Sequence, residues 1–292
     1  MAASPLLEPA LLARLEALSV LVRRPVKGHM GGQRRSLSRG RSPEFADFRN
    51  YAPGDDFRLI DWNAYARLDR FMLRLFVAEE EMPMSVFIDL SGSMDWGVPN
   101  KAYTAKRLAA ALAYVALSSL DRVRLTVFAE GPTSGGAPYR GRHVAHDMFS
   151  RIASFPVGGK TDYSKLVAPI SRQRPGMSIL ITDGLGESPL EPALSALQLA
   201  RQEGAVLQVL APQEIDLDWA GDALLVDAET GVERELTATP ATQAAYRLAL
   251  ARRTEDAQRI AQRRGLRFVR LTSDQSIDDM VQRTLRRIGL LG

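Results

Sequence analysis

The feature that most constrains the fold is an alternation of short apolar runs and helical patterns that begins at Pro83. Residues 85–90 (SVFIDL) and 178–182 (SILIT) are short, continuous apolar runs, as strands buried on both faces are. Residues 102–120 and 242–264 instead carry apolar side chains at helical spacing. Strands that alternate with helices form right-handed βαβ units. The sequence therefore predicts an α/β domain with a mainly parallel sheet covered by helices on both faces.

The remaining elements of this domain follow the same alternation. Gly265 ends the longest helical pattern, because glycine readily takes up the left-handed conformation found after helices. We also expect strands at 123–129, 205–210 and 266–271, helices at 147–154, 190–203 and 277–288, and a hairpin over 224–236 that turns at Thr230 and Gly231.

The chain has a different character before Pro83. The first residues predict an amphipathic helix, with Leu11, Leu15, Leu18 and Val22 on one stripe. The stretch 23–49 is rich in arginine and glycine and shows no clear periodicity. We therefore divide the chain into residues 1–82, an N-terminal helix with an Arg/Asp-rich module, and residues 83–292, the α/β domain.

Composition excludes several classes of protein. The 292 residues include no cysteine, so disulfides, cysteine-ligated metals and thiol nucleophiles are excluded. The net charge of +4 is too small to indicate nucleic-acid binding by itself. No stretch reaches the ~18 apolar residues of a membrane-spanning helix. The N-terminal helix is not preceded by the basic region of a signal peptide, so we expect a cytoplasmic protein.

Polar residues gather at the predicted ends of two strands. Asp89, Ser91 and Ser93 follow the strand at 85–90, Asp183 follows the strand at 178–182, and Thr161 lies in a glycine-rich loop between them. In open α/β sheets, ligands bind beyond the carboxyl ends of the strands. The side chains of these residues offer only oxygen atoms as metal ligands, and only two of the five are carboxylates. Such a donor set suits Mg²⁺, which keeps several waters.

The spacing of the first three residues has a local explanation. Where a strand turns into a loop, residues two apart point to one side, and Gly92 permits the tight turn. Asp89 either contacts the metal or holds a metal-bound water and orients the serines. The alternative is structural: Ser91 and Ser93 cap the following helix, and Asp183 with Gly184 forms a turn.

Together, Asp89, Ser91, Ser93, Thr161 and Asp183 resemble the metal-ion-dependent adhesion site of von Willebrand factor type A domains. The resemblance covers about Met84 to the C-terminus. It implies a type A-like (Rossmann-like) fold and a non-enzymatic binding site. It also implies Mg²⁺, or another divalent cation such as Mn²⁺ or Ca²⁺, with one coordination position open to an Asp or Glu of a partner protein.

The upstream module carries the motifs GRSPEFADFR at 40–49, YAPGDD at 51–56, Arg58, IDW at 60–62 and AR at 66–67. With these motifs it resembles the bacterial "domain of unknown function 58" (DUF58) family. That resemblance implies an adaptor that works with a MoxR-type AAA+ ATPase, or with its client, in the assembly or maturation of protein complexes. Larger members of the family carry N-terminal transmembrane helices, and this sequence has none.

Two other functions stay open from the residues alone. A Mg²⁺-dependent phosphoesterase would use the same cation to polarise a phosphoryl oxygen, but it would need a second carboxylate where Ser91 stands. Nucleic-acid binding would use the basic segment 34–49, but its loop 34–41 has no interleaved aromatic residues. The charged residues of 55–70 predict either an internal salt-bridge network or a docking surface.

Other chemistry finds little support in the sequence. His143 and His146 lack an acidic third residue at the spacing of a zinc site. Ser91 is not in a nucleophile elbow, because residues 89 and 93 are not glycine. The loop that includes Thr161 lacks the first glycine of a phosphate-binding P-loop.

Overall fold

The computed structural model describes residues 6–21, 45–76, 82–119, 121–129, 132–134, 136–217 and 221–292. The chain forms two units, one from residues 1–22 and 82–292 and the other from residues 23–81. The first unit is the α/β domain that the sequence predicts. Each unit is described by itself below.

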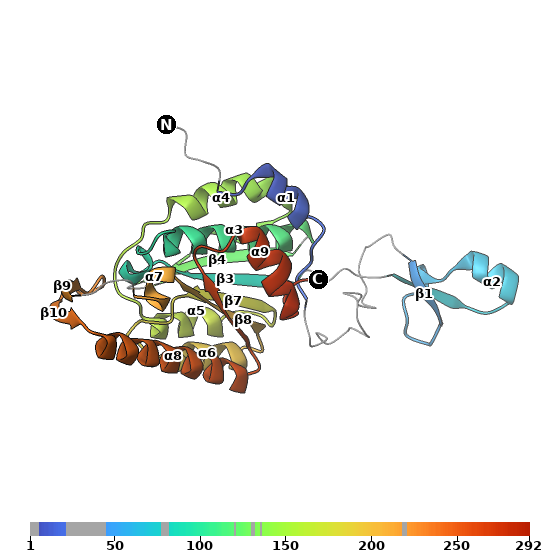
Figure 1. The fold of residues 1–292 in the computed structure, drawn as a ribbon. Coiled ribbons are helices and arrows are strands. Elements are labelled where there is room, and N and C mark those ends of the chain that lie inside the picture. The colour runs from blue at the N-terminus through green and yellow to red at the C-terminus, as the bar shows by residue number, and fades with distance from the viewer. Residues whose placement is uncertain are drawn as a thin grey trace. The chain divides into compact units, whose positions relative to one another are not determined.

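A seven-stranded sheet lies at the centre of the α/β unit (Figure 1). Its strand order is β11-β8-β7-β3-β4-β5, with β6 also paired to β4. All pairs from β11 to β4 are parallel, and only β5 and β6 run antiparallel to β4. The predicted mainly parallel sheet is therefore confirmed. The strands are β3 (Pro83–Asp89), β4 (Arg122–Phe128), β5 (Pro132–Ser134), β6 (Tyr139–Arg140), β7 (Met177–Thr182), β8 (Glu203–Leu210) and β11 (Arg267–Thr272).

Helices cover both faces of the sheet (Figure 1). Successive residues of β3 show how one strand serves two cores: Val86 and Ile88 face the first, and Phe87 faces the second. The first face is covered by α1 (Pro9–Leu15), α3 (Lys101–Ser118), α4 (Ala145–Ser154) and α9 (Ile277–Asp279), and the second by α5 (Val167–Ser171), α6 (Glu191–Leu199) and α8 (Pro240–Arg263).

Helix α3 is buried along most of its length because many of its residues are alanines, which allow close approach to the sheet. The Asn100 side chain accepts a hydrogen bond from the Tyr103 N–H and so caps its first turn. Helix α9 continues as a π-helical turn over Met280–Leu285. The predicted helices at 102–120, 147–154, 190–203, 242–264 and 277–288 all have counterparts, and only their ends differ.

The predicted hairpin forms from β9 (Gly221–Val226) and β10 (Glu233–Ala238). As predicted, Thr230 and Gly231 lie in its turn, within the connection 227–232. The Asp227 carboxylate accepts hydrogen bonds from the N–H groups of Glu229 and Thr230. This Asx-type cap stabilises the loop. The hairpin joins α7 (Pro212–Ile215) to α8.

The N-terminal residues pack on the α/β unit. Leu11 and Leu15 of α1 are buried in its first core, and the Tyr114 hydroxyl donates a 2.7 Å hydrogen bond to Glu16. Val20 pairs with Leu291 near the C-terminus. The predicted division of the chain assigns these residues to the module 1–82, whereas the structure groups them with 82–292. The predicted apolar stripe is buried at Leu11, Leu15 and Leu18, and Val22 lies outside the described residues.

The second unit contains the antiparallel pair β1 (Phe45–Asn50) and β2 (Met72–Phe76), and the helix α2 (Trp62–Leu68). Several of its charged residues have structural partners. Asp61 caps α2 by accepting from the N–H groups of Asn63 and Ala64, and Arg49 pairs with Asp55 at 2.8 Å. These contacts favour the internal-network interpretation for those residues. Most of the basic segment 34–49 lies outside the described residues.

Where the chain is described, no helix combines the length and apolar character needed to cross a membrane.

The packing of α1 leads to a stability prediction. Leu15 is fully buried, so Leu15→Ala should lower the free energy of unfolding by about 2–5 kcal/mol through lost burial and a residual cavity. Leu199→Ala is the matched control, because Leu199 is 84% exposed and its loss should cost under about 0.5 kcal/mol. Denaturant titration measures both values. Equal, small effects would show that α1 is not part of this core.

Candidate metal centre

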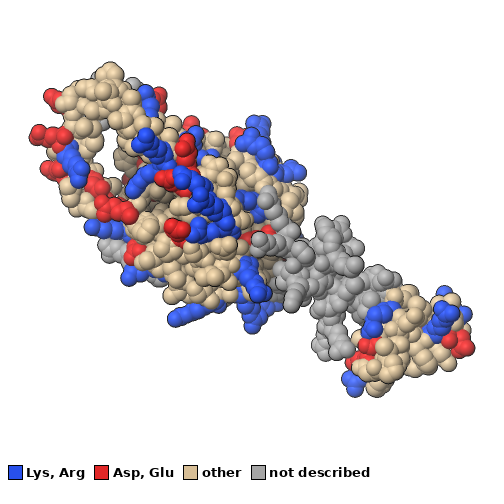
Figure 2. Space-filling model, turned by 90° about the horizontal axis from the view of Figure 1, so that it is seen from below, with Lys and Arg blue, Asp and Glu red and all other residues tan. Residues whose placement is uncertain are grey.

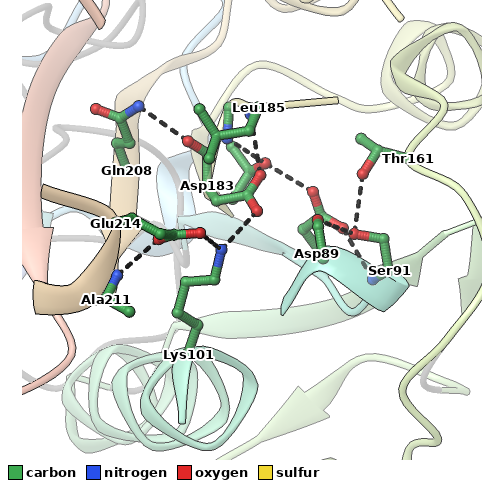
Figure 3. A network of polar contacts seen from close by, with 12 residues as sticks. Asp89, Ser91, Lys101, Thr161, Asp183, Leu185, Gln208, Ala211 and Glu214 are labelled. Carbon is green, nitrogen blue, oxygen red and sulfur yellow. Dashed lines mark hydrogen bonds and ion pairs between the residues drawn. The ribbon is translucent and has the colours of Figure 1, made fainter. Parts of the chain in front are cut away.

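The candidate centre lies where β3 and β7 end side by side. These neighbouring strands are parallel, so Asp89 at the end of β3 and Asp183 just after β7 share one edge of the sheet (Figure 3). Ser91 and Ser93 follow β3 in the next turn, and Thr161 comes from the loop after α4. The structure thus brings residues from three stretches of the chain to one place.

Three hydroxyl groups form the centre of this cluster. Thr161 Oγ1 lies 2.9 Å from Ser91 Oγ, and Ser91 Oγ lies 3.1 Å from Ser93 Oγ. Ser91 is fully buried and Thr161 nearly so. The main-chain N–H of Gly92 donates to the carbonyl of Gly159, which ties the loop after β3 to the loop that carries Thr161. The predicted convergence of Thr161 with Ser91 is therefore present in the structure.

Asp89 is a buried carboxylate held by neutral donors. Its Oδ1 accepts from the Ser91 N–H at 3.1 Å, and its Oδ2 accepts from the Thr182 hydroxyl at 2.7 Å. Tyr163 lies 2.8 Å from the same hydroxyl and supports this arrangement. Burial, and then the nearby charge of Asp183, raise the pKa of Asp89 to about 7. None of these donors carries positive charge.

Asp183 has a different environment. The ammonium group of Lys101 donates to Asp183 Oδ2 at 2.9 Å and also contacts Glu214, and the Leu185 N–H donates to Asp183 Oδ1 (Figure 3). The side chains of Lys101 and Asp183 are fully buried. Burial alone would lower the pKa of Lys101, but the two carboxylates outweigh it and raise that pKa. Asp183 is thus charge-paired within the protein, and Asp89 is not.

The donor set fits a divalent cation. Hydroxyl and carboxylate oxygens are the hard ligands that Mg²⁺, Mn²⁺ and Ca²⁺ accept, and positive charge beside Asp89 would offset the cost of burying it. Ser91, Ser93, Thr161 and Asp89 are the residues placed to hold such an ion. Asp183 is hydrogen-bonded to Lys101, so we do not count it among these ligands. It lies next to them and adds negative charge to the edge of the sheet.

The structure adds Glu229, which sequence reasoning misses. Glu229 Oε1 lies 2.8 Å from Thr161 Oγ1, and its Oε2 accepts from the Thr161 N–H at 3.1 Å. This residue belongs to the turn of the β9–β10 hairpin. A coordination position open to a partner's carboxylate stays a prediction, and in the structure the carboxylate of Glu229 lies against Thr161.

Lys101 and Glu214 also lack a signal in the sequence. A lysine at the start of a helix ordinarily predicts a solvated side chain.

Across the residues that the structure describes, no three His, Asp or Glu side chains gather in a way that could hold a metal ion. His143 and His146 thus have no third such side chain beside them there, and the hydroxyl-rich cluster stays the candidate.

Comparison with known proteins relates the chain to one family. A model of "Protein of unknown function DUF58" matches residues 47–257. The uncharacterized protein Rv1480 of Mycobacterium tuberculosis is 32% identical over 275 residues, which cover 92% of this chain and 86% of that protein.

Solved structures share the general architecture at low identity. BatB from Bacteroides thetaiotaomicron is 18% identical, with a TM-score of 0.45 over 71% of this chain and 98% of that one. A von Willebrand factor type A structure from Catenulispora acidiphila is 16% identical, with a TM-score of 0.44 over 73% of this chain and 43% of that one.

The buried ion pair leads to a second stability prediction. Lys101→Met leaves Asp183 and Glu214 without their cation, so the free energy of unfolding should fall by about 3–5 kcal/mol. Arg247→Met is the control, because its pair with Asp216 is exposed and such pairs contribute about 0–1 kcal/mol. Chemical denaturation distinguishes the two. A Lys101→Met protein as stable as the control variant would refute the assigned role.

Proposed function

Because the chain belongs to the DUF58 family of proteins of unknown function, we propose that it is a non-enzymatic adaptor that binds protein partners through a divalent cation. The cation is held by Ser91, Ser93, Thr161 and Asp89. When bound, it supplies a coordination position for an acidic side chain. Mg²⁺ is the first choice for this oxygen-only donor set, and Mn²⁺ or Ca²⁺ are the alternatives.

One observation carries this proposal. The Ser91 hydroxyl lies 2.9 Å from that of Thr161 and 3.1 Å from that of Ser93, beside a buried carboxylate whose hydrogen-bond donors are all neutral. Burial of an ionised group without an opposite charge is costly. The structural alternative from the sequence, helix capping by the serines, is not supported, because Ser91 makes no cap hydrogen bond to the short helical turn that follows it.

The residues around the centre favour binding over catalysis. A phosphoesterase would need a second carboxylate, near Asp89, that is free to act as nucleophile or base. Asp183 is the nearby candidate, but Lys101 and the Leu185 N–H engage both of its oxygens. Glu229 is engaged by Thr161 in the same way. The adaptor is therefore the better supported function.

The partner that we propose follows from the family resemblance. It is a MoxR-type AAA+ ATPase or a client of that ATPase, with an Asp or Glu that completes the coordination of the cation. Nucleic-acid binding is the weaker alternative, since the net charge is only +4 and the basic loop 34–41 has no interleaved aromatic residues.

Metal binding provides the direct test of the centre. Asp89→Asn removes the unpaired carboxylate, so its affinity for Mn²⁺ should fall at least tenfold by isothermal titration, in line with the roughly 10–100-fold losses seen around metal sites. Asp95→Asn is the matched control, because Asp95 is exposed on the same loop and its carboxylate accepts a hydrogen bond from the Asn100 side chain. Thermal unfolding of the metal-free variants checks that both are folded. Equal Mn²⁺ affinities would contradict the assignment.

Partner binding tests the adaptor function. A purified MoxR-type ATPase from the same source should bind the wild type and Asp95→Asn in Mg²⁺, and binding should weaken at least tenfold in EDTA or with Asp89→Asn, a loss of about 1.4 kcal/mol. If neither EDTA nor Asp89→Asn weakens binding, the contact does not depend on the metal.

Hydrolysis of p-nitrophenyl phosphate in Mg²⁺ should stay at background. Hydrolysis that Asp89→Asn abolishes would favour the phosphoesterase instead.

A further inference from the structure

The β9–β10 hairpin reaches the candidate metal centre through its turn. It projects at one end of the α/β unit, between α7 and α8 (Figure 1). Most side chains of its two strands are exposed, including those of Leu224, Leu225 and Val226. Glu229 is an exception, because it is half-buried against Thr161. The turn is thus the part of the hairpin that engages the centre.

Two separate contacts place this turn. Both carboxylate oxygens of Glu229 bond to Thr161, one through its hydroxyl and one through its N–H. Next to it, the carbonyl oxygen of Ala228 packs so closely on Gly92 that a Cβ atom there would lie only 2.4 Å away. Gly92 stands between the two serines of the centre. The turn therefore contacts both loops that supply hydroxyl groups.

The turn is built to hold Glu229 in this direction. Asp227 accepts from the N–H groups of Glu229 and Thr230 and from the Thr230 hydroxyl. The Thr230 side chain, followed by these main-chain donors, lowers the pKa of Asp227, so its carboxylate stays charged and its cap stays formed. The orientation of Glu229 is therefore set by the turn as well as by Thr161.

The rest of the hairpin is weakly anchored. A two-stranded hairpin is marginally stable by itself, and the exposed strands bury little apolar surface. Acidic residues predominate on it, with Asp222, Asp227, Glu229, Glu233 and Glu235 against Arg234, and Figure 2 shows acidic side chains gathered at this end of the unit. Such elements open at low free-energy cost.

We propose that Glu229 is an internal ligand of the metal centre, which takes the coordination position that a partner's Asp or Glu would otherwise take. The inference rests on the proposed function. In the closed state the hairpin turn completes the centre. A partner's acidic side chain binds only when the hairpin lifts. Its apparent affinity is therefore the intrinsic affinity multiplied by the fraction of protein in which the hairpin is open. The hairpin is thereby a selective gate for acidic ligands.

Titration with Mn²⁺ alone tests this assignment. Glu229→Gln keeps the size of the side chain and removes its charge, so its Mn²⁺ affinity should fall roughly tenfold or more, since affinity follows the charged ligands. Glu233→Gln is the matched control, because Glu233 is an exposed acid on the same hairpin, and its affinity should equal that of the wild type. Acetate should restore part of the lost affinity in Glu229→Gln and leave the wild type unchanged.

Hydrogen exchange gives a second readout that does not depend on affinity. Mn²⁺ should slow amide exchange over residues 221–238 in the wild type and in Glu233→Gln, and have no such effect in Glu229→Gln.

The possible failures are distinguishable. If Glu229→Gln binds Mn²⁺ as tightly as the wild type, and Mn²⁺ slows its hairpin exchange equally, Glu229 is not a ligand and the metal centre itself stands. If the wild type binds no Mn²⁺, both this inference and the proposed function are overturned.

Discussion

Two carboxylates buried side by side at the ends of β3 and β7 determine the chemistry of this protein. When like charges lie close together in an apolar interior, each raises the free-energy cost of burying the other. Opposite charge must then compensate them. The chain compensates Asp183 with Lys101 and leaves Asp89 with neutral donors only. The surrounding hydroxyl groups and the acidic turn of the hairpin are arranged around that remaining charge.

The same helix serves stability and the site. Helix α3 packs along the sheet through its alanines, and its first residue, Lys101, reaches the carboxylates at the edge of the sheet (Figure 3). Lys101 also contacts Glu214, whose other oxygen accepts from the Ala211 N–H at the end of β8. The ion cluster thus links β7, β8 and α3. Disturbance of the site is consequently expected to affect the core as well.

The sequence was informative where local pattern decides the structure. Short apolar runs located β3 and β7, and the rule that ligands bind at the ends of parallel strands located Asp89, Ser91 and Asp183. It was uninformative about contacts between distant residues. Asp183 is 82 positions from Lys101, and Glu229 is 68 positions from Thr161. For the same reason, the apolar stripe of α1 predicted a buried face without showing which unit it covers.

The charge of the hairpin turn also explains how the centre can exchange ligands. When both are ionised, Asp89 and Glu229 together carry two negative charges, which match one divalent cation, while Lys101 is shared between Asp183 and Glu214. A partner's carboxylate that replaced Glu229 would leave this balance unchanged. The choice between the internal and the external acid then depends on the cost of lifting the hairpin and on the fit of the partner. Since the hairpin strands are largely exposed, and Ala228 and Glu229 of its turn contact the loops of the hydroxyl groups, that cost lies mainly in these two contacts.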